Sequence, residues 1–205
     1  MSWYTVRVPA SSANLGPGFD SLGLALGVYL TCRFRRAEQL QIRVSGRDTG
    51  RISTGPDNLI WRTAQDVAEG HRAAMPPIEL EIHNDIPLGR GMGSSAAALT
   101  AGVVIADQLL GLGWKALRVL DEAARLEGHP DNVAACTLGS IVASGIDSAA
   151  WPALSASICR RNFPWRLSYR ILNCPRPSRA PSYPTATARP TPFSMFSGQH
   201  CSWRR

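Results

Sequence analysis

All acidic residues of this 205-residue chain lie in its first 147 positions, which limits the part that can fold around one core. Residues 1–147 hold 13 of the 22 Lys and Arg and all 15 Asp and Glu, for a net charge of −2. Residues 148–205 hold nine Arg, no acid, eight of the 15 prolines and no valine. We therefore predict a globular domain over 1–147 and an aberrant, disordered Arg-, Pro- and Ser-rich tail over 148–205.

The composition of the tail is also what a shifted reading frame would produce. Back-translating residues 179–204, with each codon begun one base earlier, permits a string that contains acids, valines and a helical apolar pattern. Codon degeneracy leaves some bases free, so the back-translation shows that the printed sequence is compatible with a shifted frame. The hypothesis is a frameshift that begins between residues 148 and 160. Genomic DNA with one uninterrupted frame, identical to the printed one, would contradict it.

The rest of the composition argues against several classes of protein. The chain has no run of 18 apolar residues and no basic N-terminal region followed by an apolar stretch, so we predict no membrane span and no signal peptide, and expect a cytoplasmic protein. Its five cysteines lack CxxC spacing, so neither a disulfide framework nor a zinc site is supported. The overall charge of +7 comes from the tail, and we expect no nucleic-acid or membrane partner.

Apolar patterns predict a mixture of strands and helices, with a Ser-, Asn- and Gly-rich loop at 10–20. Short or alternating apolar segments predict strands at 6–9, 40–44, 78–82 and 138–143, and apolar residues also run through 22–30. Helical patterns predict helices at 58–72, 96–110 and 116–126.

A glycine-rich loop precedes the small-residue helix at 96–110. Gly89, Gly91 and Gly93 leave their backbone N–H groups unshielded, and Ser94 and Ser95 add hydroxyls at the first helical turn. The helix dipole also favours anions there, by about 0.3–1 kcal/mol when exposed, so a triphosphate suits the turn. The string is neither a Walker A nor a GxGxxG motif. Taken alone, it could simply let a helix pack closely.

Residues 87–97, Pro-Leu-Gly-Arg-Gly-Met-Gly-Ser-Ser-Ala-Ala, resemble the ATP-binding motif of GHMP kinases, with Met92 in place of the usual Leu. That change conserves volume. The resemblance implies the α+β GHMP fold, with its N-terminal domain over 1–147 and its C-terminal domain missing or replaced by the tail. It also implies Mg²⁺ held with the help of Ser94 or Ser95. The residues implied to wrap ATP are Pro87, Leu88, Gly89, Arg90, Gly91, Met92, Gly93, Ser94, Ser95, Ala96 and Ala97.

Two further segments resemble the homoserine kinase branch of this family: VPASSANLGPGFD at 8–20 and EGHPDNVA at 127–134. The resemblance implies transfer of a phosphoryl group from ATP to the hydroxyl of L-homoserine, in threonine biosynthesis, by a protein expected to be a homodimer when intact. Asp and Asn side chains can accept hydrogen bonds from the substrate ammonium group. The residues implied near the substrate are Asn14, Asp20, His129, Asp131 and Asn132, with Asp131 and Asn132 as catalytic residues.

Several roles stay open at this point. Phosphoryl transfer needs mainly positioning and charge neutralisation, so Asp131 is only a candidate base. Mg²⁺ needs oxygen ligands; Glu127 is the first choice and Glu122, on the same predicted helix, is the alternative. Taken singly, Asp20 could cap a turn and His129 could bond to a backbone carbonyl.

Two departures from the family pattern are Ala135-Cys136, where Pro-Ala is common, and Gly139-Ser140, where Gly-Gly is common. We expect neither to touch the chemistry. The string hidden in the shifted frame resembles the segment that opens the C-terminal domain of homoserine kinases. We therefore expect the intact gene to encode the kinase and this product to be inactive or nearly so. The alternatives are a GHMP kinase for another small alcohol, such as mevalonate, and a nucleic-acid binder that uses the basic tail.

Overall fold

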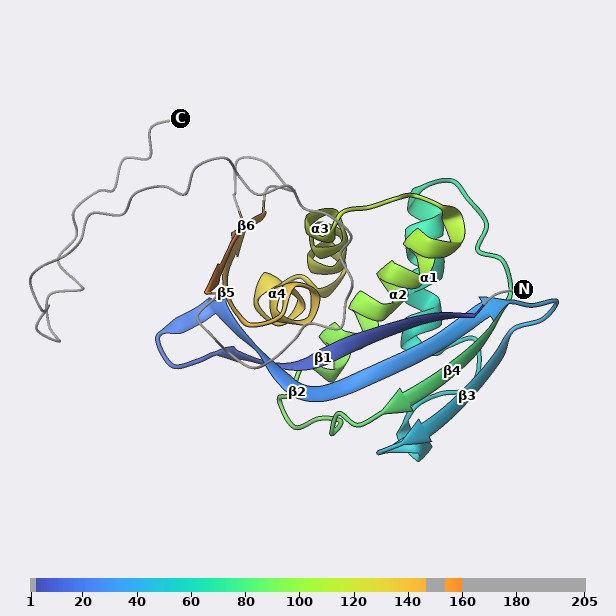
Figure 1. The fold of residues 1–205 in the computed structure, drawn as a ribbon, viewed down its shortest axis with the longest axis horizontal. Helices are drawn as coiled ribbons and strands as arrows, with labels where there is room; N and C mark the ends of the chain where they lie inside the picture. The colour runs from blue at the N-terminus through green and yellow to red at the C-terminus, as the bar shows by residue number, and fades with distance from the viewer. Residues whose placement is uncertain (1–2, 147–153, 160–205) are drawn as a thin grey trace, which may run out of the picture. The chain divides into compact units, whose positions relative to one another are not determined.

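A mixed β-sheet with helices on one face makes up the part of the chain that the structure describes (Figure 1). The computed structural model describes residues 3–146 and 154–159. The strands follow the order β3-β4-β2-β5-β6, and β1 pairs with β2 outside this path. Their bounds are β1 Tyr4–Asn14, β2 Gly18–Arg36, β3 Gln41–Gly46, β4 Ile78–Asn84, β5 Ile141–Ile146 and β6 Leu154–Cys159. This architecture confirms the predicted α+β class.

The β1–β2 hairpin is much longer than the sequence predicted. β1 continues through Asn14 and β2 already begins at Gly18, so the expected loop at 10–20 is wrong for most of its length. Ser and Ala side chains are small enough for close pairing, and Ser12 lies opposite Leu24 in the antiparallel register. The glycine and proline content that suggested a loop is concentrated in the turn between the two strands.

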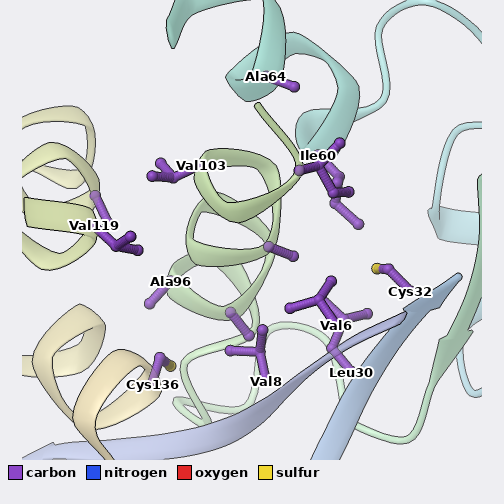
Figure 2. Packing of buried hydrophobic residues seen from close by; sticks show 14 of the residues in the cluster. Val6, Val8, Leu30, Cys32, Ile60, Ala64, Ala96, Val103, Val119 and Cys136 are labelled. Atoms are coloured by element: carbon purple, nitrogen blue, oxygen red, sulfur yellow. The ribbon is translucent and has the colours of Figure 1, made fainter. Parts of the chain in front are cut away.

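The core lies between the sheet and the helices. Alternate residues of the strands, such as Val6 and Val8 on β1 and Leu30 and Cys32 on β2, are buried on the helix side (Figure 2). Fully burying a side chain of this size contributes about 1.5–3 kcal/mol. Figure 2 shows these strand residues together with residues of four helices, namely Ile60 and Ala64 of α1, Ala96 and Val103 of α2, Val119 of α3 and Cys136 of α4.

The helices are α1 Leu59–Gly70, α2 Ser94–Leu110, α3 Ala116–Glu127 and α4 Pro130–Leu138, with a short 3₁₀ helix, η1, at Thr49–Arg51. Asn58 caps α1, because its Oδ1 accepts the N–H groups of Ile60 and Trp61 at 3.0 and 3.4 Å. Pro130 is the first residue of α4, where proline's fixed φ favours helix initiation. The sequence prediction missed α4 because Pro-Asp-Asn also resembles a turn.

The sheet continues past the predicted domain boundary at residue 147. β6 pairs antiparallel with β5, and Ile158 lies opposite Val142. The short alternation Leu-Ser-Ala-Ser-Ile-Cys is compatible with such a strand, although the prediction had made all of 148–205 irregular. Residues 160–205, which carry most of the frameshift hypothesis, lie outside the described residues.

No helix within the described ranges combines the length and the apolar character needed to cross a bilayer.

Candidate functional site

The glycine loop joins β4 to α2 in a conformation that needs glycine at three positions. Gly89, Gly91 and Gly93 have φ values of 70°, 67° and 64°, all in the left-handed region. Gly93 is the N-cap of α2 and has no side chain to satisfy the first N–H groups of the helix. These N–H groups therefore point out of the helix end uncapped by a side chain, as an anion site requires.

Gly93 is also the point where three distant segments of the chain meet. A Cβ atom there would overlap Ser11 Oγ and would lie 3.2 Å from Asn132 Oδ1. Ser11 Oγ donates to Asn132 Oδ1 at 2.8 Å, and the Ser11 N–H donates to the Met92 carbonyl at 3.1 Å. We call Ser11, Gly93 and Asn132 the junction. It ties the first strand, the glycine loop and the start of α4 together.

Ser11 is a site residue that sequence reasoning missed. It lay inside the first motif but had no assigned role, because strand alternation after Val6 and Val8 would turn position 11 away from the core. The β1–β2 register shifts between Pro9 and Ala10, and Ser11 becomes fully buried beyond that irregularity. No residue pattern in the segment predicts this shift of the strand register.

Cys136, which belongs to one of the two departures from the family pattern, contacts the junction. Its thiol donates to the Pro9 carbonyl at 3.2 Å and approaches Ser11 Oγ at 3.5 Å. Complete burial raises the pKa of the Cys136 thiol to about 12, so the group remains a neutral donor. The substitution therefore helps to hold the serine that positions Asn132.

Asp131 and Asn132 occupy the first turn of α4. Asp131 is buried, with 3% of its surface exposed, and its Oδ1 accepts the Asn132 N–H at 2.7 Å. A carboxylate at this end of a helix is stabilised by the helix dipole. Gly23 of β2 allows α4 to lie close to the strand, because a Cβ at Gly23 would overlap the Asp131 carbonyl oxygen. Of the two predicted catalytic residues, Asn132 lies beside Gly93 of the glycine loop, and Asp131 is bonded to Asn132.

Glu127 lies at the C-terminal end of α3, next to the first turn of α2. Ser95 Oγ donates to Glu127 Oε2 at 3.3 Å. Partial burial raises the pKa of Glu127, an effect opposed by the Ser95 hydrogen bond and the nearby His129 and reinforced by Asp131. The competitor Glu122 is buried and engaged by two guanidinium groups, those of Arg118 and Arg125. Of the two glutamates, Glu127 is the one beside the serine loop.

The oxygen groups at this point fit Mg²⁺. The described residues contain no group of three or more His, Cys, Asp or Glu side chains that could hold a metal alone. Mg²⁺ commonly takes only one or two protein carboxylates and completes its shell with phosphate and water. The Glu127 carboxylate and the hydroxyl of Ser95 provide such a partial set.

The predicted substrate residues Asn14 and Asp20 lie at the tip of the β1–β2 hairpin. Asn14 Oδ1 accepts the Asp20 N–H at 3.0 Å, and both residues have positive φ, at 69° and 52°. Phe19 beside them is 75% exposed. Among the described residues, no hydrogen bond links this tip to the glycine loop or to His129, the exposed N-cap of α4.

A cavity of about 390 Å³ adjoins the glycine loop. Its volume falls within the range of small-molecule sites. Its lining includes Leu88, Ser94 and Ser95, together with several residues from the segment between β3 and the first turn of α1. The sequence prediction had assigned no role to the polar residues of that segment, which include Arg51, Ser53, Asp57 and Asn58.

Known proteins match the part of the chain that carries the glycine loop and α4. Residues 58–140 match the family GHMP kinases N terminal domain. The chain is 76% identical over 147 residues to the homoserine kinase of Solibacter usitatus, covering 72% of this chain and 48% of that protein. It is 45% identical over 144 residues to the homoserine kinase of Deinococcus radiodurans, covering 70% of this chain and 47% of that protein.

A solved structure of a candidate homoserine kinase from Listeria monocytogenes superimposes with a TM-score of 0.67 and 38% identity, over 77% of this chain and 53% of that chain. The match to the GHMP kinases N terminal domain over residues 58–140 and the superposition on the Listeria structure thus agree on the fold of this part of the chain. In sequence, the same part is similar to homoserine kinases. The chain spans about half the length of the curated relatives it matches.

Proposed function

We propose that residues 1–147 form the nucleotide-binding half of an ATP-dependent homoserine kinase that phosphorylates the hydroxyl of L-homoserine to O-phospho-L-homoserine, in threonine biosynthesis. The single observation that carries the proposal is the junction. Ser11, Gly93 and Asn132 come from the three segments that resemble the kinase family, and they contact one another. Similarity to two homoserine kinases supports the choice of substrate.

The residues divide the work between nucleotide and substrate. The glycine loop and the start of α2 offer backbone N–H groups to the triphosphate, while the adjoining cavity accommodates the nucleoside. Asn132, which lies beside Gly93, and its neighbour Asp131 would orient the substrate hydroxyl toward the phosphate; the bond between them supports this pairing. Asn14, Asp20 and His129 would receive the charged amino-acid end of the substrate. Positioning and charge neutralisation of this kind are what phosphoryl transfer requires.

We assign the metal position to Glu127 and Ser95, with Ser94 as the alternative hydroxyl. Mg²⁺ would neutralise phosphate charge and help to orient the γ-phosphate. The 3.3 Å contact between Ser95 and Glu127 supports this assignment. The pKa of Glu127 is raised, so protons compete more strongly with the metal for this carboxylate. As the pH is lowered, metal binding should therefore begin to weaken at a higher pH than it would at an ordinary glutamate.

A chimera tests the proposed activity. Residues 1–147 are joined to the C-terminal half of the Solibacter usitatus homoserine kinase, and ADP release is measured with ATP, Mg²⁺ and either L-homoserine or mevalonate. We expect turnover with L-homoserine and an Asn132→Ala variant with at least 100-fold lower kcat/KM. Turnover with mevalonate alone would move the proposal to another small alcohol, and no turnover with either would overturn it.

The unaltered 205-residue chain is expected to be inactive or nearly so in the same assay. Homoserine phosphorylation by this chain at the rate of the chimera would contradict that expectation. We place the protein in the cytoplasm, and expect the intact kinase to be a homodimer. Neither nucleic acid nor a membrane surface has a place in the proposed function.

A further inference from the structure

Leu88, near the start of the glycine loop, makes backbone hydrogen bonds with two side chains. The Asp48 Oδ2 atom accepts the Leu88 N–H at 2.9 Å, and the Arg51 Nη1 atom donates to the Leu88 carbonyl at 3.2 Å. Both side chains belong to η1 and its N-cap, 37 to 40 residues earlier in the sequence. The backbone at the entrance to the loop is therefore fixed by a segment that carries no recognised motif.

Arg51 is placed to do more than hold the loop. Its Nη2 atom lies 3.6 Å from the position that a Cβ would take at Gly89, and its side chain lines the same 390 Å³ cavity as Ser94 and Ser95. A guanidinium group has five N–H donors, and the Leu88 carbonyl takes one of them. The other donors are available beside the loop.

Arg51 also differs from the arginines that are held by buried carboxylates. Arg35 and Arg43 both pair with Glu79, and Arg118 and Arg125 both pair with Glu122. Over residues 3–146, Arg51 forms no ion pair. Within this range no carboxylate pairs with it directly, and its orientation is already set by the Leu88 carbonyl. A pre-oriented planar guanidinium loses less side-chain entropy when it binds phosphate oxygens.

We propose that Arg51 binds the polyphosphate of the nucleotide directly, as a fixed cation beside the backbone N–H donors of the glycine loop. The inference rests on the proposed function, because it takes the cavity and the glycine loop as the nucleotide site. Arg90, also exposed on the loop, makes no hydrogen bond or ion pair among the described residues, so its charge lacks this fixed orientation.

Nucleotide binding to the full 205-residue chain tests the inference. Affinities for ATP, ADP, AMP and adenosine are measured by calorimetry for the parent chain and for Arg51→Ala, Arg51→Lys and Arg47→Ala. Arg47 is the matched control, because it lies between β3 and η1, four residues before Arg51, and is also exposed. Its side chain makes no hydrogen bond or ion pair within the described part. Chemical unfolding of each variant verifies that the fold is retained.

We expect Arg51→Ala to weaken ATP binding about tenfold, the size of a charged hydrogen bond, with a smaller loss for ADP and AMP and none for adenosine. The loss should shrink at high salt, and Arg51→Lys should recover part of it. Arg47→Ala should bind like the parent. An equal loss for ATP and adenosine, or no loss at all, would overturn the role of Arg51 while leaving the proposed function standing. A parent chain that binds no ATP would overturn both.

Discussion

The junction and the hairpin tip both include residues of β1 but are built differently. At the junction, Ser11 is fully buried and a Cβ on Gly93 would overlap its hydroxyl oxygen. At the tip, a few residues further along β1, Asn14 holds Asp20 by one backbone hydrogen bond, and Phe19 is 75% exposed. The junction is therefore packed as a protein interior, whereas the hairpin tip is an exposed turn.

This difference indicates where stability and specificity reside. Changes at the junction should disturb the fold and the nucleotide site together, because the same contacts carry both. Changes at the tip should leave the fold almost intact and affect only the proposed substrate. The following predictions run from the largest expected effect on stability to the smallest.

Gly93→Ala should cost about 3 kcal/mol of unfolding free energy and abolish ATP binding. The new Cβ would clash with Ser11 Oγ at a residue with φ of 64°. Gly91→Ala is the matched control, because its φ is 67° but no atom lies within 4 Å of its Cβ position. It should cost only about 1 kcal/mol of left-handed strain. Equal losses in urea unfolding would show that the junction is not crowded.

Ser11→Ala should destabilise the fold by about 1–2 kcal/mol, because Asn132 Oδ1 loses a buried hydrogen-bond donor. It should also weaken ATP binding through the misplaced Asn132. Ser12→Ala, one residue along the same strand and only partly buried, should stay within about 0.5 kcal/mol of the parent. Urea unfolding compares the two variants; a Ser12→Ala loss as large as that of Ser11→Ala would break the comparison.

Glu127→Gln should stabilise the fold at neutral pH, by less than about 1 kcal/mol because the side chain is partly solvated. The raised pKa means that the native state holds this proton more tightly than the unfolded chain. The unfolding free energy therefore falls as pH rises from the ordinary glutamate value of 4.5 through the raised one. The variant should lack that fall and should lose Mg²⁺-dependent ATP binding. Parallel pH profiles of urea unfolding would contradict the prediction.

Asp20→Asn should leave stability within about 0.5 kcal/mol of the parent, because the side chain is exposed and its backbone bond to Asn14 survives. In the chimera it should raise the KM for L-homoserine at least tenfold while the KM for ATP stays unchanged. A destabilisation as large as that of Ser11→Ala would show that the tip is structural.

The sequence predicted those features that depend on local pattern. The helix after the glycine loop and the strands at β3 and β4 follow from apolar periodicity, and the loop itself follows from three alternating glycines. Positions 127 and 95 could be selected because their chemistry suits a metal, although only the fold shows that they meet.

Features that depend on long-range contacts could not be predicted. Burial of Ser11 follows from a register shift in the β1–β2 pair, and the hold on Leu88 comes from a segment whose residues match no motif. The Pro-Asp-Asn run becomes helical because α4 packs on β1, β2 and β5, which local propensity does not include.

The junction also has a consequence for how the protein acquires its site during synthesis. The Ser11 to Asn132 bond spans 121 residues, so the first strand leaves the ribosome long before its partner helix exists. Contacts of such large sequence separation form late and slowly. Nucleotide that binds only the finished junction would stabilise the completed domain and no earlier intermediate. In the cell, ATP would thus favour chains that have already brought their first strand and their last helix together.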